Sequence, residues 1–234
     1  MKLRIDCPEC FQTGKASTVQ VEPTNEGRFE ATCDAGHHFN ISILYNDFQI
    51  LFEIGINAIH DGYYREAIGS FTASYERFLE FFVRIVVTSS GANADEFCKA
   101  WKHIRNQSER QLGAFIFVHL MTYQETPLLL SETQVSLRNG VIHKGKIPTR
   151  ADCVTYGNDI IKIILSVLRR LWKSHQEEVV RSINTKIVDN SDKTPRVIYL
   201  PWLTLPTNRE PPNEVDNPNL EALLDGIAWV REQG

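Results

Sequence analysis

The sequence predicts a mainly α-helical protein, in which a helical bundle follows a small β region and precedes a proline-rich C-terminal arm. From residue 46 to about residue 184, apolar residues recur at spacings of three and four, the period of an amphipathic helix. Residues 1–45 instead contain short alternating segments separated by turn residues. After residue 185, six prolines interrupt the chain. We therefore expect three parts, 1–45, 46–184 and 185–234.

Composition indicates an ordinary globular chain without a membrane-spanning segment. The 234 residues carry a net charge of -4, so nothing draws the whole protein to nucleic acid or to an anionic membrane. Contact with nucleic acid must come from a local patch or a partner. No apolar run approaches the roughly 18 to 20 residues that span a bilayer, and the N-terminus lacks the apolar region of a signal peptide. We expect a cytoplasmic protein.

The first part of the chain predicts three strands. Residues 17–22 and 28–33 alternate in hydrophobicity on either side of a turn at 23–27, and residues 39–45 form the third candidate strand. A region this small buries little apolar surface, so it needs a disulfide or a metal to stabilise it.

Paired ligands in this region predict a structural zinc ion. Cys7 and Cys10 form a Cys-x2-Cys knuckle, and Cys33 and His37 supply a Cys-x3-His pair after the intervening strands. Two such pairs provide the four ligands of a tetrahedral site. Three of the five cysteines lie in the first 33 residues, which is metal-ligand usage in a reducing compartment rather than a disulfide framework. The alternative is a metal-free hairpin with cysteines placed by chance.

The second knuckle, Cys-Asp-Ala-Gly-His-His-Phe over residues 33–39, is similar to that of zinc ribbons with the pattern Cys-x-x-Gly-His-x-Phe. This resemblance favours His37 over His38 as the fourth ligand, although His38 stays open. Gly36 allows the tight turn that a knuckle needs.

The helical part begins with two helices, 47–60 and 63–88, followed by a shorter helix at 95–104. In the second helix, four aromatic residues recur at spacings of three and four and indicate a core-facing stripe. They are Phe71, Tyr75, Phe78 and Phe82.

Three more helices complete the predicted bundle. Capping-box patterns at Ser108 and Ser131 open helices that run to about residue 123 and residue 144. The last long helix is expected over residues 150–182. In the arm that follows, we expect an apolar stretch at 197–205 and a short helix at 219–232. A disordered tail rarely carries so many aliphatic and aromatic residues, so this arm should dock on the bundle or on a second subunit.

Arg138, Asn139 and His143 form a candidate reactive group near the end of the helix that starts at Ser131. A second Arg-x4-His match, at Arg170 and His175, lacks the asparagine and lies in the last long helix. That second match is interpreted as groups at a solvated helix end.

Arg138-Asn139-x3-His143, followed by the break before the last long helix, resembles the HEPN superfamily of helical ribonuclease-like domains. The resemblance covers about residues 47–184, and its specific part is the segment 137–149. It implies a metal-independent endoribonuclease whose site is shared by two copies of the domain. Such domains occur in toxins, CRISPR-associated effectors and phage-defence proteins. The implied partners are RNA, a second copy of the chain, and an antitoxin or defence-system protein.

The residue types suit this chemistry. A histidine such as His143 can accept and donate protons, while Arg138 carries a positive charge and can bind phosphate oxygens. Asn139 would orient His143 or the phosphate, and Lys144 and Lys146 would attract the substrate. No cofactor is expected for catalysis.

The chain departs from the family pattern at one position, and the sequence also allows an alternative function. Some toxin members carry a tyrosine two residues after the histidine, where this chain has Gly145, so control by adenylylation of that tyrosine is not expected. The alternative function is an inactive HEPN module that dimerises and recognises protein or nucleic acid.

Overall fold

The computed structural model describes residues 3–15, 17–24, 27–184, 196–199 and 204–232. The chain forms two compact units, one from residues 1–46 and 181–202 and the other from residues 47–180 and 203–234. The C-terminal tail, which we expected as one arm, therefore contributes to both units. Among the described helices, none is both long enough and apolar enough to cross a membrane.

The first sheet joins β1 (Leu3–Asp6) and β2 (Thr18–Val21) in antiparallel pairing, with Leu3 opposite Val21. The short helix α1 (Pro8–Gln12) lies between them in the chain. The sequence analysis did not predict β1. Leu3 is fully buried and every second residue of the strand faces the interior, but four residues are too few for that alternation to stand out.

The second sheet has the order β3 (Arg28–Thr32), β4 (His38–Leu44) and β5 (Arg196–Tyr199). β4 pairs antiparallel with β3 and parallel with β5. The strands on either side of the turn at 23–27 do not pair with each other. β2 pairs back with β1, and β3 pairs forward with β4 because the tight turn between Cys33 and His37 joins them directly.

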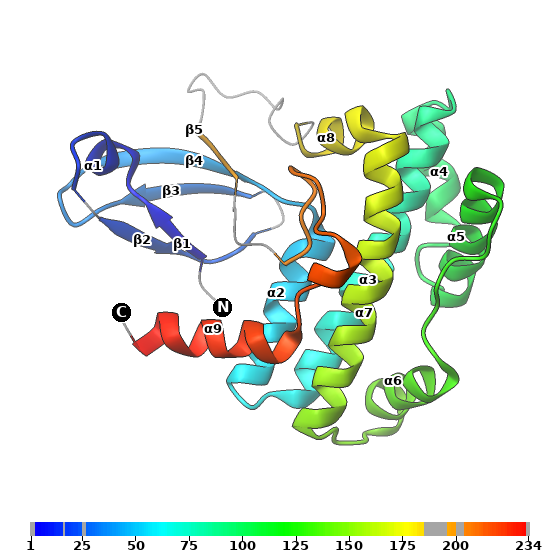
Figure 1. The fold of residues 1–234 in the computed structure, drawn as a ribbon. Coiled ribbons are helices and arrows are strands. Elements are labelled where there is room, and N and C mark those ends of the chain that lie inside the picture. The colour runs from blue at the N-terminus through cyan, green and yellow to red at the C-terminus, as the bar shows by residue number, and fades with distance from the viewer. Residues whose placement is uncertain (1–2, 16, 25–26, 185–195, 200–203, 233–234) are drawn as a thin grey trace. The chain divides into compact units, whose positions relative to one another are not determined.

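The core of the helical unit lies around α3 (Tyr64–Ser89), which packs against α2 (Asp47–His60), α5 (Ser108–Tyr123) and α7 (Arg150–Ser174) (Figure 1). The aromatic stripe predicted to face the core is confirmed as buried. Its members are Phe71, Tyr75, Phe78 and Phe82.

The smaller helices are α4 (Ala94–Lys102), α6 (Glu132–Lys144) and α8 (Gln176–Asn184). The single last helix predicted over residues 150–182 is interrupted at His175, whose φ of -141° and ψ of 35° leave the helical region. The Oγ atom of Ser174 donates to the carbonyl oxygen of Arg170 and lies 2.6 Å from Nδ1 of His175. Such side-chain bonds compete with the helical backbone bonds, which accounts for the break.

Of the two predicted capping serines, only one caps its helix, and it does so without the reciprocal bond of a capping box, because the side chain of Gln134 donates to Asp159. Ser131 caps α6, because its Oγ accepts from the backbone N–H of Gln134 at 3.3 Å. Ser108 does not cap α5. It is the first helical residue, and Gln107 before it supplies no side-chain cap.

Residues 204–232 belong to the helical unit and end in α9 (Leu220–Glu232), which confirms the predicted short helix. Leu220 is fully buried and packs closely on Gly157 of α7. A Cβ atom on Gly157 would lie only 2.8 Å from the side chain of Leu220. The single-turn 3-10 helix η2 (Glu214–Asp216) precedes α9. Residues 200–203 of the predicted apolar stretch, including Trp202, lie outside the described residues.

Candidate functional site

Cys7, Cys10, Cys33 and His37 come together at one end of the two sheets. Cys7 directly precedes α1 and Cys10 lies within it, while Cys33 follows β3 and His37 precedes β4. Their ligand atoms all lie within 4.8 Å of one another, and the three cysteines are buried. Gly36, at a φ of 82°, permits the tight turn between the last two ligands.

The distances within this cluster match a tetrahedral metal site. Nδ1 of His37 lies 3.6 Å from Sγ of Cys7, 3.3 Å from that of Cys10 and 3.5 Å from that of Cys33. The Sγ atoms of Cys10 and Cys33 are 3.8 Å apart. With zinc bonds of about 2.3 Å to sulfur and about 2.0 Å to nitrogen, a regular tetrahedron has edges of ~3.8 Å between sulfurs and ~3.5 Å between sulfur and nitrogen. This Cys3His cluster can therefore hold a structural metal ion.

The thiols of the cluster influence one another's ionisation. Burial opposes ionisation of Cys33, but hydrogen bonds at the backbone of His37 and Ala35 and from the other two thiols lower its pKa to about 6. Burial and the neighbouring Cys7 and Cys33 raise the pKa of Cys10 to about 11. The first thiolate therefore hinders the formation of the next one, and a bound cation would relieve this repulsion.

The structure places His37, not His38, in the cluster. His38 is exposed and its Nδ1 lies 2.7 Å from Oγ1 of Thr32. His37 uses Nδ1 toward the thiols, which leaves Nε2 facing the Glu9 carboxylate at 3.8 Å. A carboxylate in this position can orient a metal-binding imidazole.

In the helical unit, Arg138 is held from several sides. Its Nη1 donates to Oδ1 of Asn139 at 2.7 Å, and its Nη2 donates to Oγ of Ser108 at 3.3 Å. Nη2 also lies 4.0 Å from a carboxylate oxygen of Glu76 on α3. The side chain is only 19% exposed. Arg138 thus joins α6 to α3 and α5 through a mostly buried side chain.

His143 lies one turn after Asn139 on α6, about 40° around the helix from Asn139 and about 140° from Arg138. It is exposed in the last turn, which Gly145 ends at a φ of 69°. Leu137 and Val141 define the buried face of α6, and His143 is about 200° around the helix from Val141. Within the described chain, His143 makes no hydrogen bond with Arg138 or Asn139. The structure therefore brings Arg138 and Asn139 into contact and places His143 one helical turn after Asn139, on nearly the same side of α6.

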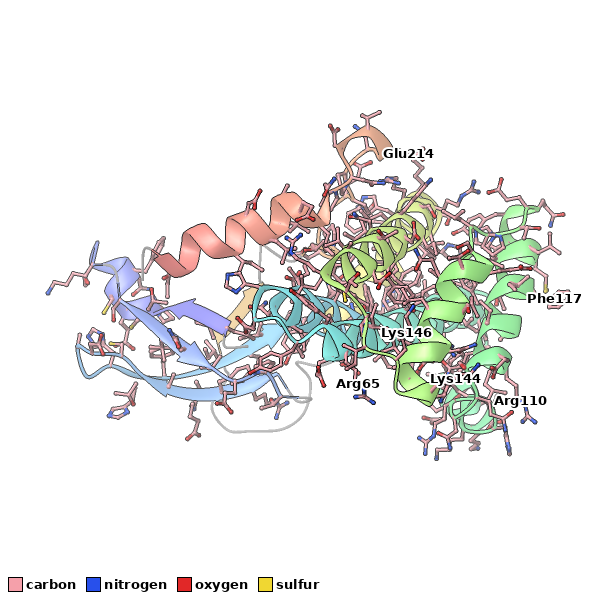
Figure 2. The ribbon with its side chains drawn as sticks, turned by 90° about the horizontal axis from the view of Figure 1, so that it is seen from below. Arg65, Arg110, Phe117, Lys144, Lys146 and Glu214 are labelled. Atoms are coloured by element: carbon pink, nitrogen blue, oxygen red, sulfur yellow. The ribbon has the colours of Figure 1, made fainter. Side chains whose placement is uncertain are left out.

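Two shallow hollows follow the surface of α6. The larger, of about 880 Å³, lies between α6 and the start of α7 and includes Lys144, Lys146 and Asp152 in its wall. The smaller, of about 340 Å³, is lined in part by Asn139 and Lys144. Arg138 and His143 line neither hollow. Lys144 and Lys146 project at the end of α6 and in the connection after it (Figure 2).

Sequence reasoning did not find Glu76 and Ser108 as partners of Arg138. No spacing links these residues, and the Ser108 pattern pointed to a capping role instead. The second Arg-x4-His match has a structural explanation. Arg170 forms an ion pair with Glu125 and lies 5.3 Å above the ring of Tyr123, and His175 ends α7.

The chain was compared with protein-family models, with curated proteins and with solved structures, and none of them matches it.

Proposed function

We propose that this protein is a metal-independent endoribonuclease of the HEPN type, acting as a bacterial toxin or antiphage effector. The observation that carries the proposal is the contact between Arg138 and Asn139. It fixes the orientation of a guanidinium on the same short helix that presents an exposed histidine in its last turn. Within this class of site, a fixed cation and a titratable imidazole are what RNA transesterification needs.

In this reaction, the 2′-oxygen bonds to the adjacent phosphorus and the bond from phosphorus to the 5′-oxygen breaks. The products are a 2′,3′-cyclic phosphate and a 5′-hydroxyl. His143 accepts the 2′ proton or donates one to the leaving oxygen, and Arg138 stabilises the negative charge on the phosphorane. Asn139 orients Arg138, and Lys144 and Lys146 attract the phosphate backbone.

Two proton transfers call for two imidazoles, so the complete site needs a second copy of the chain. An apolar surface supports this requirement. Phe117 is 66% exposed, Leu120 40% and Met121 77%, and their spacings of three and four place them on one outward face of α5 (Phe117 is labelled in Figure 2). The same helix begins at Ser108, which contacts Arg138. Phe117 lies nine residues after Ser108, about half a turn around the helix. Association through this face would pair two copies of the chain.

For the Cys3His cluster, we propose zinc in a structural role. Three thiolates and one imidazole are ligands that zinc prefers. Four protein ligands leave no open position for substrate, which is consistent with catalysis that does not use the metal. Reduced thiols of this kind fit a cytoplasmic location.

Incubation with a mixed RNA pool in EDTA tests the proposal. The parent should cleave RNA into fragments with cyclic phosphate ends, and His143→Ala should abolish cleavage. His175→Ala, from the second Arg-x4-His match, is the matched control and should stay active. Circular dichroism must run alongside, because loss of zinc could unfold the N-terminal unit. The proposed enzymatic activity is contradicted if the parent is folded and dimeric but does not cleave RNA. It is also contradicted if the His143→Ala variant is fully active.

One observation favours a second candidate, an inactive HEPN module for dimerisation and recognition. Arg138 donates to Asn139 and Ser108, and in the described chain no hydrogen bond joins it to His143. A folded, dimeric and inert protein in the same experiment would support this second function.

A further inference from the structure

The connection between α4 and α5 concentrates positive charge on the helical unit. Residues 102–110, here named the basic turn, contain Lys102, Arg105 and Arg110, all exposed, and one acidic residue, Glu109. In the part of the chain that the structure describes, these three cations form no ion pair. The whole protein has a net charge of -4, so this excess of positive charge is a local feature of the basic turn.

The basic turn has a well-defined backbone. The N–H of Arg105 donates to the carbonyl oxygen of Trp101 at 2.9 Å, and the buried Gln111 donates through Nε2 to the carbonyl oxygen of Arg105 at 2.6 Å. Ile104 packs against the core of the helical unit. Because these contacts fix the backbone, the cationic side chains can bind a ligand without the entropic cost of ordering the loop.

The basic turn adjoins the proposed reactive group. It includes Ser108, whose Oγ accepts from Nη2 of Arg138. Arg110, labelled in Figure 2, lies two residues further along α5 and donates through Nη1 to the carbonyl oxygen of His103 at 3.4 Å. Its remaining guanidinium N–H groups stay available for another acceptor.

We propose that the basic turn binds the phosphate backbone of single-stranded RNA and leads the strand to Arg138. This inference rests on the proposed function, because that function makes RNA the ligand of the adjacent site. Lys102 and Arg105 are the principal contacts, and exposed Asn106 and Gln107 add neutral hydrogen-bonding groups beside them. Contacts of this kind position a strand without reading its sequence.

Binding is measured by fluorescence anisotropy with a labelled single-stranded RNA, in the His143→Ala background so that no cleavage occurs. The test variant is Lys102→Gln with Arg105→Gln. The matched control is Lys162→Gln with Arg209→Gln, which removes two other exposed cations from α7 and from the C-terminal segment. Both variants lower the net charge equally. Circular dichroism checks that each one is folded.

We expect the test variant to bind RNA about tenfold more weakly at 0.1 M salt, and the control within about twofold of its parent. The slope of log affinity against log salt should become shallower by ~1.4 in the test variant, because each lost phosphate contact contributes ~0.7 for a single strand. Equal weakening in both variants, or none in the test variant, would overturn the inference. If the His143→Ala protein binds RNA through the basic turn but the protein with His143 intact never cleaves RNA, only the proposed enzyme is refuted.

Discussion

The guanidinium of Arg138 donates to the side-chain oxygen of Asn139 at 2.7 Å, between neighbouring residues on one turn of α6. Adjacent residues on a helix point about 100° apart, so only the length of the arginine side chain lets them meet. The asparagine thereby acts on the arginine rather than on the histidine four residues later.

This contact predicts the effect of Asn139→Ala on cleavage. Loss of one hydrogen bond to a charged group, of about 1.5 kcal/mol, should lower kcat about tenfold by leaving Arg138 less well oriented. The fold should be retained, since Asn139 is only half-buried. Single-turnover RNA cleavage checks this, with the exposed Ser136→Ala on the same helix as control. An unchanged rate would show that the contact has no part in catalysis.

The apolar face of α5 predicts a dimer that depends on it. Phe117→Glu with Met121→Glu should convert the dimer into a monomer, because charged groups cannot be buried there without partners. RNA cleavage should be lost together with the dimer. Sedimentation measures the mass, and Val215→Glu is the control because Val215 is 93% exposed on η2. If the variant with both substitutions is still a dimer, the dimer interface does not lie on this face of α5.

The metal cluster predicts one equivalent of zinc in the purified protein. Cys10→Ser should lose the zinc and destabilise the N-terminal unit, because the bound metal links the two ligand pairs and its binding free energy adds to that of folding. Elemental analysis and circular dichroism check the two effects. Cys98→Ser, in the helical unit and remote from the cluster in sequence, should keep the zinc. If the purified parent contains no zinc, the assignment of a zinc site to this cluster is wrong.

Glu53 predicts a dependence of stability on pH. Burial raises its pKa to about 7, although the backbone and side chain of Thr204 partly oppose this through hydrogen bonds. The folded state therefore holds a proton that the unfolded state releases above its pKa of about 4.5. The stabilising contribution is complete at acidic pH and is lost as pH rises toward 7. The loss is about 3 kcal/mol.

Glu53→Gln should remove this slope and unfold at higher urea than the parent at pH 8, while differing little near pH 5. The difference between the two proteins isolates Glu53, because other titrating groups contribute equally to both. Parallel pH profiles for parent and variant would contradict the raised pKa.

Local patterns in the sequence were enough for much of the fold. The three-four spacing of apolar residues predicted the helices around the buried stripe, since a helix fixes which residues share a face. The two ligand pairs likewise predicted the cluster at Cys7, Cys10, Cys33 and His37, because each knuckle is set by residues a few positions apart.

Contacts between distant segments were decided only by the tertiary structure. Nothing in the local pattern of β5 indicated that it pairs with β4, which is more than 150 residues earlier in the chain. Likewise, the motif placed Arg138 beside Asn139 but did not identify Glu76 and Ser108 as its other neighbours. Periodicity shows which side of a helix is buried, whereas the partners on that side depend on how the helices pack.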